Sequence, residues 1–135
     1  MIDYVDTSAY LKLLIEEPES ALLAETLERA RTDGRLLVSS MLLTTELRRA
    51  AWRLAIPLTE IDAELEKINL ISVADSTFAR AGAFPDPRLR SLDAIHLATA
   101  IECDATTIYT YDSRLSDAAR GVGIVVSAPS PAPSN

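Results

Sequence analysis

Short apolar runs alternate with longer amphipathic segments along most of the chain, and this alternation constrains the fold more than any other feature. The apolar runs predict strands at residues 2–6, 35–39, 69–74, 106–112 and 123–127. The amphipathic segments predict helices at residues 7–17, 19–33, 41–55, 58–68, 75–84, 91–100 and 113–121. Because strands that alternate with helices form parallel sheets covered on both faces, we expect an α/β sandwich with a mostly parallel central sheet.

One domain over residues 1–126 is the simplest organisation, since a chain of 135 residues can bury a sizeable core. Residues 127–135 are rich in proline and serine and are predicted to form a disordered tail. No apolar run approaches the length of a membrane span, and a single cysteine, Cys103, excludes an internal disulfide. These features predict a cytoplasmic protein without a membrane segment.

The net charge of −7 limits the partners that the whole surface can attract. A protein with this charge repels a polyanion such as RNA on average. Nucleic-acid binding would therefore require a local basic patch or bound cations.

Two acids stand where predicted strands end. Asp6 is the last residue of the strand at 2–6, and Asp112 is the last residue of the strand at 106–112. Parallel strands end at the same edge of a sheet, and ligands bind beyond that edge. Both carboxylates are therefore predicted to project there.

Two helices each carry one carboxylate at the rim of the apolar stripe. At about 100° per residue, Leu97 falls about 40° from Asp93, and Ala50 falls about 40° from Glu46. A carboxylate beside a core is costly unless it is paired, hydrogen-bonded or bound to a metal.

Each of these two acids has a simpler explanation when it is taken alone. Asp93 could favour the positive end of its helix, and Glu46 could pair with Arg49 or Arg53. A shared divalent cation instead accounts for all four acids at once. Carboxylate oxygens suit Mg²⁺, which usually takes one or two of them directly and contacts the others through water.

Three further polar residues are predicted to lie outside this cluster. One histidine and one cysteine supply too few ligands for a typical zinc site. His96 falls about 60° from Asp93, away from the centre of the apolar stripe, and is predicted to lie on the helix surface or at a subunit contact. Asp3 and Asp117 are predicted to be surface residues, although a role for Asp117 in the site stays open.

Four segments together resemble the acidic motifs of the PIN domain, and more narrowly those of VapC-type toxin ribonucleases from VapBC toxin–antitoxin systems. In chain order these segments are YVDTSAYLKL, TTELRRA, SLDAIHLATA and TIYTYDSRL. The resemblance covers residues 1 to about 126 and implies a PIN-like three-layer α/β/α sandwich. It also implies that the family's catalytic, metal-binding acids are Asp6, Glu46, Asp93 and Asp112. Thr7, Ser8 and Thr110 match hydroxyl residues that support the first aspartate or the waters of the metal.

The resemblance further implies a Mg²⁺- or Mn²⁺-dependent endoribonuclease that forms a homodimer and has a VapB-like antitoxin. In this hypothesis Asp6 and Asp93 are the main ligands, Asp112 completes the site, and Glu46 orients or deprotonates the attacking water. Arg49 and Arg53 are predicted to contact RNA phosphate.

Other functions remain open in different degrees. A haloacid dehalogenase-type phosphatase would need a second aspartate where Ser8 stands, and a receiver-like domain would need a lysine after a late strand. A catalytically silent module that only binds its antitoxin or RNA stays possible. The sequence leaves open which RNA is cut and where, how many ions act, and which surfaces meet a second copy or the antitoxin.

Overall fold

A computed structural model describes residues 1–132 and contains one five-stranded sheet. All neighbouring strands are parallel, in the order β3-β2-β1-β4-β5. The strands are β1 (Ile2–Val5), β2 (Leu36–Ser40), β3 (Asn69–Ile71), β4 (Thr107–Tyr109) and β5 (Val125–Ser127). The predicted α/β fold is confirmed, with a sheet that is wholly rather than mostly parallel.

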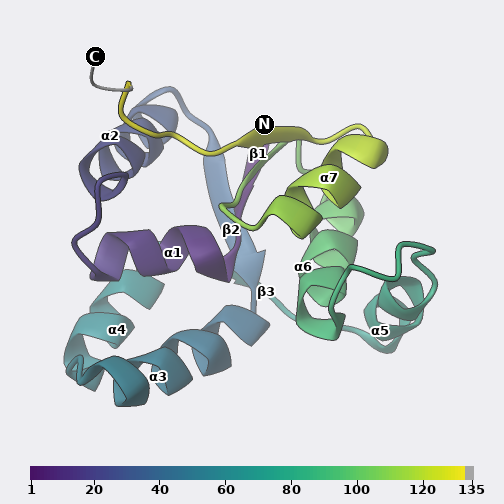
Figure 1. Cartoon of the computed structure of the whole chain (residues 1–135), viewed down its shortest axis with the longest axis horizontal. Coiled ribbons are helices and arrows are strands. Elements are labelled where there is room, and N and C mark those ends of the chain that lie inside the picture. The colour runs from purple at the N-terminus through teal and green to yellow at the C-terminus, as the bar shows by residue number, and fades with distance from the viewer. Residues whose placement is uncertain (133–135) are drawn as a thin grey trace.

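Seven helices within the described residues connect these strands and cover the sheet. They are α1 (Thr7–Leu14), α2 (Ser20–Thr32), α3 (Leu42–Leu54), α4 (Leu58–Leu65), α5 (Asp75–Gly82), α6 (Ser91–Glu102) and α7 (Ser113–Gly121). Figure 1 shows α1 to α4 on one side of the sheet and α5 to α7 on the other. The predicted three-layer sandwich is therefore confirmed.

Each face of the sheet has its own core because successive residues of a strand point to opposite faces. Tyr4 of β1 and Ile108 of β4 pack with residues of α6 and α7. The next residues, Val5 and Tyr109, pack with residues of α1, α2 and α3. The strands at the centre of the sheet are therefore buried on both sides, which is typical of parallel sheets.

The register of β1 and β4 determines which residues meet at the carboxyl edge of the sheet. Val5 is aligned with Tyr109, and the backbone N–H of Asp6 donates to the Tyr109 carbonyl at 3.1 Å. The segments that leave these two strands therefore start side by side.

The prediction that Asp3 lies on the surface is wrong. Asp3 is 1% exposed, and its Oδ2 accepts a hydrogen bond from Arg35 Nε at 2.7 Å, with a second guanidinium nitrogen on Oδ1. A two-pronged guanidinium contact of this kind compensates a carboxylate for lost hydration. Asp117 is exposed as predicted, and it forms ion pairs with Arg88 and Arg120.

The chain beyond the last strand differs slightly from the predicted boundary. Ser127 is the last residue of β5, so it belongs to the sheet and not to the tail. The Pro129 carbonyl accepts a hydrogen bond from the Tyr111 hydroxyl at 2.7 Å. Residues 133–135 lie outside the described part of the chain, and disorder in the tail stays a prediction.

No helix within residues 1–132 combines the length and the apolar character that crossing a membrane would require.

Replacing Leu97 tests the core between the sheet and α6. Leu97 is fully buried, so Leu97→Ala should lower the free energy of unfolding by about 2–5 kcal/mol through lost burial and a residual cavity. Leu92 lies on the same helix but is 47% exposed, so Leu92→Ala should change this free energy by less than about 0.5 kcal/mol. Urea unfolding measures both values, and equal losses would contradict the assigned packing of α6.

Candidate active site

Two of the predicted site acids lie between a strand and the helix that follows it. Asp6 follows β1 and is the N-cap of α1, where its Oδ1 accepts a hydrogen bond from Ala9 N at 3.0 Å. Asp112 lies beyond β4 and is the N-cap of α7, where its Oδ1 accepts from Leu115 N at 2.9 Å. Both helices begin at the carboxyl edge of the sheet, so capping holds these carboxylates at that edge.

Hydroxyl groups connect the two strand ends. Ser8 Oγ donates to Asp6 Oδ1 at 2.7 Å, and Thr110 Oγ1 donates to Asp6 Oδ2 at 2.7 Å. Thr110 Oγ1 also accepts from Asp112 N at 3.1 Å, and Ser8 Oγ accepts from Tyr111 N at 2.9 Å. Both carboxylate oxygens of Asp6 are therefore held in place by side chains of its own helix and of the neighbouring segment.

The surroundings of Asp6 disfavour its charged form overall. The residue is 2% exposed, and burial raises its pKa above the usual aspartate value. Hydrogen bonds from Ala9 N and from the Thr110 and Ser8 hydroxyls lower the pKa only in part. A cation nearby would reduce this cost, because it favours the charged form of the carboxylate.

Asp93, in the first turn of α6, is the acid on which the charges of the other three act. Burial and the charges of Asp112, Asp6 and Glu46 together raise its pKa to about 6, with burial as the largest cause. Among the described residues no group hydrogen-bonds to the Asp93 carboxylate. It is therefore a half-buried carboxylate surrounded by like charges.

Glu46 of α3 is held by two residues from other elements. Thr7 Oγ1 donates to Glu46 Oε1 at 2.7 Å, and His96 Nε2 lies 2.6 Å from the same oxygen. Burial alone would raise the pKa of Glu46, but the hydrogen bonds from His96 and Thr7 outweigh it and lower the pKa below its usual value. Glu46 therefore stays a carboxylate at neutral pH.

The prediction of a surface or subunit-contact position for His96 is wrong. His96 is 1% exposed, and its Nδ1 lies 2.6 Å from the hydroxyl of Tyr4, a buried residue of β1. The physical reason is that α6 is buried on most of its circumference, because it packs against both the sheet and α5. The angle between His96 and one apolar stripe of the helix therefore did not predict the exposure of its side chain.

Sequence reasoning missed His96 and Tyr4 as members of the site. The available signal was composition: SLDAIHLATA has no continuous polar face, and a helix that is apolar all round is usually buried. A histidine within such a helix needs a polar partner in the core. No feature of the sequence identifies that partner as a tyrosine from β1.

Arg49 and Arg53 lie beside this acidic cluster. Both line a groove of about 400 Å³ that also contains Glu46. Arg48, the preceding arginine of α3, pairs with Asp62 at 3.0 Å, whereas Arg49 and Arg53 form no ion pair with any residue in the described part of the chain. Two exposed positive charges therefore border one side of the acids.

The donor set fits a hard divalent cation bound largely through water. Within residues 1–132, no three His, Cys, Asp or Glu side chains are arranged to hold one ion directly. The charges of three carboxylates nevertheless act on Asp93, and no lysine or arginine forms an ion pair with any of the four acids in that part of the chain. Oxygen ligands with few direct contacts are the usual environment of Mg²⁺, so these residues are suited to such an ion.

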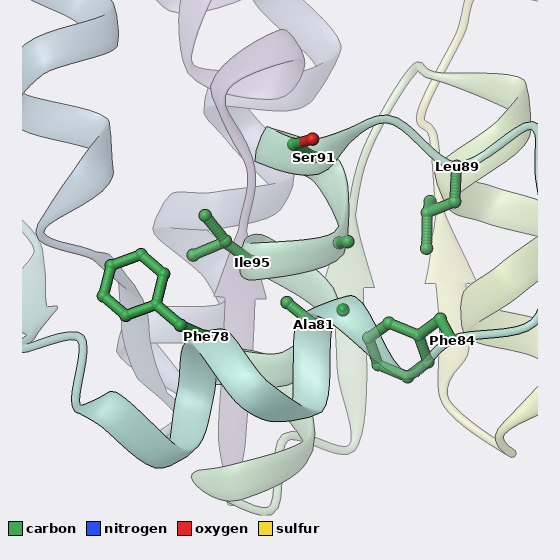
Figure 2. A pocket seen from close by; sticks show the side chains of 8 residues that line it. Phe78, Ala81, Phe84, Leu89, Ser91 and Ile95 are labelled. Atoms are coloured by element: carbon green, nitrogen blue, oxygen red, sulfur yellow. The ribbon is translucent and has the colours of Figure 1, made fainter.

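A separate pocket lies between α5 and α6 (Figure 2). It measures about 370 Å³ and is lined mainly by apolar side chains, among them Phe78, Phe84 and Ile95. At about 100° per residue, Ser91 and Ile95 fall roughly 160° and 200° from Asp93 around α6. The pocket therefore opens on the opposite face of this helix and is not part of the acidic cluster.

The chain matches the family model of the PIN domain over residues 4–121. It is 40% identical to Ribonuclease VapC35 of Mycobacterium tuberculosis, in an alignment that covers 93% of this chain and 96% of the relative. It is 37% identical to Ribonuclease VapC47 of the same species, with coverage of 93% and 96%. These similarities extend over nearly the whole length of the proteins compared.

A solved structure has the same fold at lower sequence identity. VapBC2 from Rickettsia felis, crystallised with a DNA fragment from the promoter of the pair, has a TM-score of 0.69 and 16% identity to this chain. The match covers 94% of this chain and 98% of the other. The predicted PIN-like arrangement of the sandwich is thereby confirmed.

The crowding of acids around Asp93 predicts a pH-dependent loss of stability without metal. The folded protein binds the Asp93 proton more tightly than the unfolded chain, because its pKa is raised from 3.8 to about 6. This contribution to stability is complete below the unfolded pKa and is lost as pH rises through the folded pKa. Asp93→Asn should therefore raise Tm at pH 8 in the presence of chelator by a few degrees, and by less at pH 4.

Differential scanning calorimetry at both pH values measures this effect. Asp117→Asn is the matched control, since Asp117 is exposed and paired with arginines, and it should not raise Tm. Equal Tm values for wild type and Asp93→Asn at pH 8 would show that the neighbouring acids do not destabilise the fold.

Proposed function

We propose that this chain, which belongs to the PIN-domain family, is an endoribonuclease that acts as the toxin of a type II toxin–antitoxin pair. The relatives at 37–40% identity are VapC ribonucleases by name and align over almost their whole length. The solved structure of similar fold belongs to a VapBC pair. We place the protein in the cytoplasm, where its RNA substrate and its antitoxin would both be made.

The observation that carries this proposal is that the charges of three other acids act on the half-buried Asp93. Asp112, Asp6 and Glu46 all raise the pKa of Asp93, although they come from different elements of the fold. Such a cluster is unfavourable without a counter-charge, and a divalent cation is the counter-charge that carboxylates bind best. We infer that the protein uses Mg²⁺, with Mn²⁺ as a possible substitute.

Each acid has a separate part in this proposal. Asp93 and Asp6 are the main ligands, directly or through water, and Asp112 completes the site. When bound, the cation supplies charge neutralisation at the phosphate and a lowered pKa for a coordinated water. Glu46, kept ionised by its hydrogen bonds, orients the attacking water or accepts its proton. Thr7, Ser8 and Thr110 keep the carboxylates in position through the hydrogen bonds described above.

RNA would approach this cluster along the groove that contains Arg49 and Arg53. The protein as a whole carries a charge of −7, so local positive charge is needed beside the acids. Both arginines are exposed, lack ion-pair partners within residues 1–132 and line the groove with Glu46. We assign them to phosphate contacts, which position the strand without reading its bases.

Two protein partners belong to the proposal. One is a VapB-like antitoxin, whose helical segment would dock on apolar helices and bring an arginine to the carboxylates. The other is a second copy of this chain. A groove between α2 and α4, lined in part by Leu13, Leu27 and Glu64, is one candidate surface for either partner. Most of the α2 stripe is ordinary core, since Leu23 and Leu27 are buried.

RNA cleavage with and without metal tests the catalytic proposal. Wild-type protein should cleave members of a panel of tRNA, rRNA and mRNA with Mg²⁺ and should not cleave them with chelator. Asp6→Asn and Asp93→Asn should each lower the rate more than about 100-fold, because the metal supplies several kcal/mol of transition-state stabilisation. End-labelled RNA identifies the sites of cleavage.

The same assay separates this enzyme from a silent PIN-fold module. A module that only binds its antitoxin or RNA would give no cleavage beyond that of the Asp93→Asn protein under any metal condition. Equal cleavage by wild type and both variants would indicate a contaminating nuclease or another site.

The salt dependence of RNA binding tests the phosphate contacts. Arg49→Ala should weaken binding of a single-stranded RNA and reduce the slope of log affinity against log salt by about 0.7, the value for one phosphate contact on a single strand. Arg29→Ala, on α2 and paired with Glu25, is the control and should leave the slope unchanged. Fluorescence anisotropy at several salt concentrations gives both slopes, and an unchanged slope for Arg49→Ala would reject the assignment.

A further inference from the structure

Tyr4, His96 and Glu46 form a continuous chain of hydrogen bonds, here called the Tyr4–His96–Glu46 network. The Tyr4 hydroxyl lies 2.6 Å from His96 Nδ1, and His96 Nε2 lies 2.6 Å from Glu46 Oε1. The three residues come from β1, α6 and α3, so the network joins the sheet to helices on its two opposite faces. Tyr4 and His96 are almost completely buried.

The surrounding donors favour one direction for each bond of the network. The backbone N–H of Ser40 donates to the Tyr4 hydroxyl oxygen at 3.1 Å, which leaves the hydroxyl proton free for donation to His96 Nδ1. A histidine that accepts at Nδ1 carries its proton on Nε2 when neutral. Nε2–H then donates to Glu46 Oε1, and every one of these polar groups is satisfied.

The bonds to Glu46 all reach one oxygen of its carboxylate. His96 Nε2 and Thr7 Oγ1 both contact Oε1, and Oε2 has no hydrogen-bond partner among the residues that the structure describes. A glutamate side chain has several rotatable bonds, so two contacts on one oxygen restrict where the other oxygen can point. The carboxylate is therefore held on one side and left available on the other.

We propose that His96, anchored by Tyr4, is a positioning residue that holds Oε1 of Glu46 so that Oε2 faces the metal site formed with Asp93. This inference rests on the proposed function and adds residues that the acidic motifs do not contain. Partners that hydrogen-bond to metal-binding or catalytic carboxylates orient them, and their loss typically costs about 10–100-fold in metal affinity or activity. His96 does not itself touch the substrate or the metal.

The position of the His96 proton is the first test, and it needs no metal. In ¹⁵N-labelled, metal-free protein, imidazole ¹⁵N chemical shifts and couplings to ring protons should show a proton on Nε2 of His96 and none on Nδ1. Tyr4→Phe removes the donor to Nδ1 and should change this signature. A wild-type proton on Nδ1 would overturn the network as assigned, whether or not the protein cleaves RNA.

Metal binding by substituted proteins is the second test. Mn²⁺ affinity, measured by electron paramagnetic resonance, should fall about 10–100-fold in His96→Leu, which fills the space but donates no hydrogen bond. His96→Gln should recover most of the loss, because its side-chain amide can donate near the position of Nε2. In cleavage assays His96→Leu should lower kcat while KM for RNA stays close to the wild-type value.

A matched control separates positioning from general damage to α6. Thr99 is buried on the same helix and donates only to the Ile95 carbonyl, so Thr99→Val should leave Mn²⁺ affinity unchanged. Folding of every variant is checked by circular dichroism and Tm. Wild-type affinity in a folded His96→Leu protein would overturn the positioning role and leave the proposed function intact. Absence of Mn²⁺ binding and cleavage in the wild type would overturn both.

Discussion

The in-register pairing of β1 with β4 is the constraint on which the rest of the site depends. It aligns Val5 with Tyr109 and places the two following segments side by side at the carboxyl edge of the sheet. Thr110 can then donate to Asp6, although the two residues are far apart in the sequence. The helices that start from these segments use Asp6 and Asp112 as N-caps, so one geometry serves both the fold and the acidic cluster.

The acids differ in how well their surroundings stabilise the negative charge. Asp6 is buried but accepts three hydrogen bonds, and Glu46 is stabilised by Thr7 and His96. No hydrogen bond stabilises the charged Asp93 carboxylate within the described residues, and the charges of the neighbouring acids raise its pKa. A protein that keeps this arrangement gives up stability in its metal-free form, which is a common consequence of building a site for a cation.

The fold and the positions of the acids follow from local patterns, whereas the network around His96 does not. Alternation of strands and helices predicts the parallel sheet, and the strand ends identify Asp6 and Asp112 because one residue type recurs at one edge. The prediction that Asp3 and His96 are exposed was wrong because a charged or polar residue can be buried when it has a partner, and the sequence does not identify that partner. Arg35 and Tyr4 are those partners, and contacts between distant segments have no periodicity from which they can be recognised.

The strand order also determines when the acidic cluster can exist. Asp112 and Thr110 follow β4, which can enter the sheet beside β1 only after β2, β3 and the helices up to α6 have been synthesised. A chain that ends before β4 has neither Asp112 nor Thr110, which is one of the two hydroxyl residues that donate to Asp6. In such a truncated product the Asp6 carboxylate would lose the donor on Oδ2, and the cluster of acids proposed for cleavage could not form.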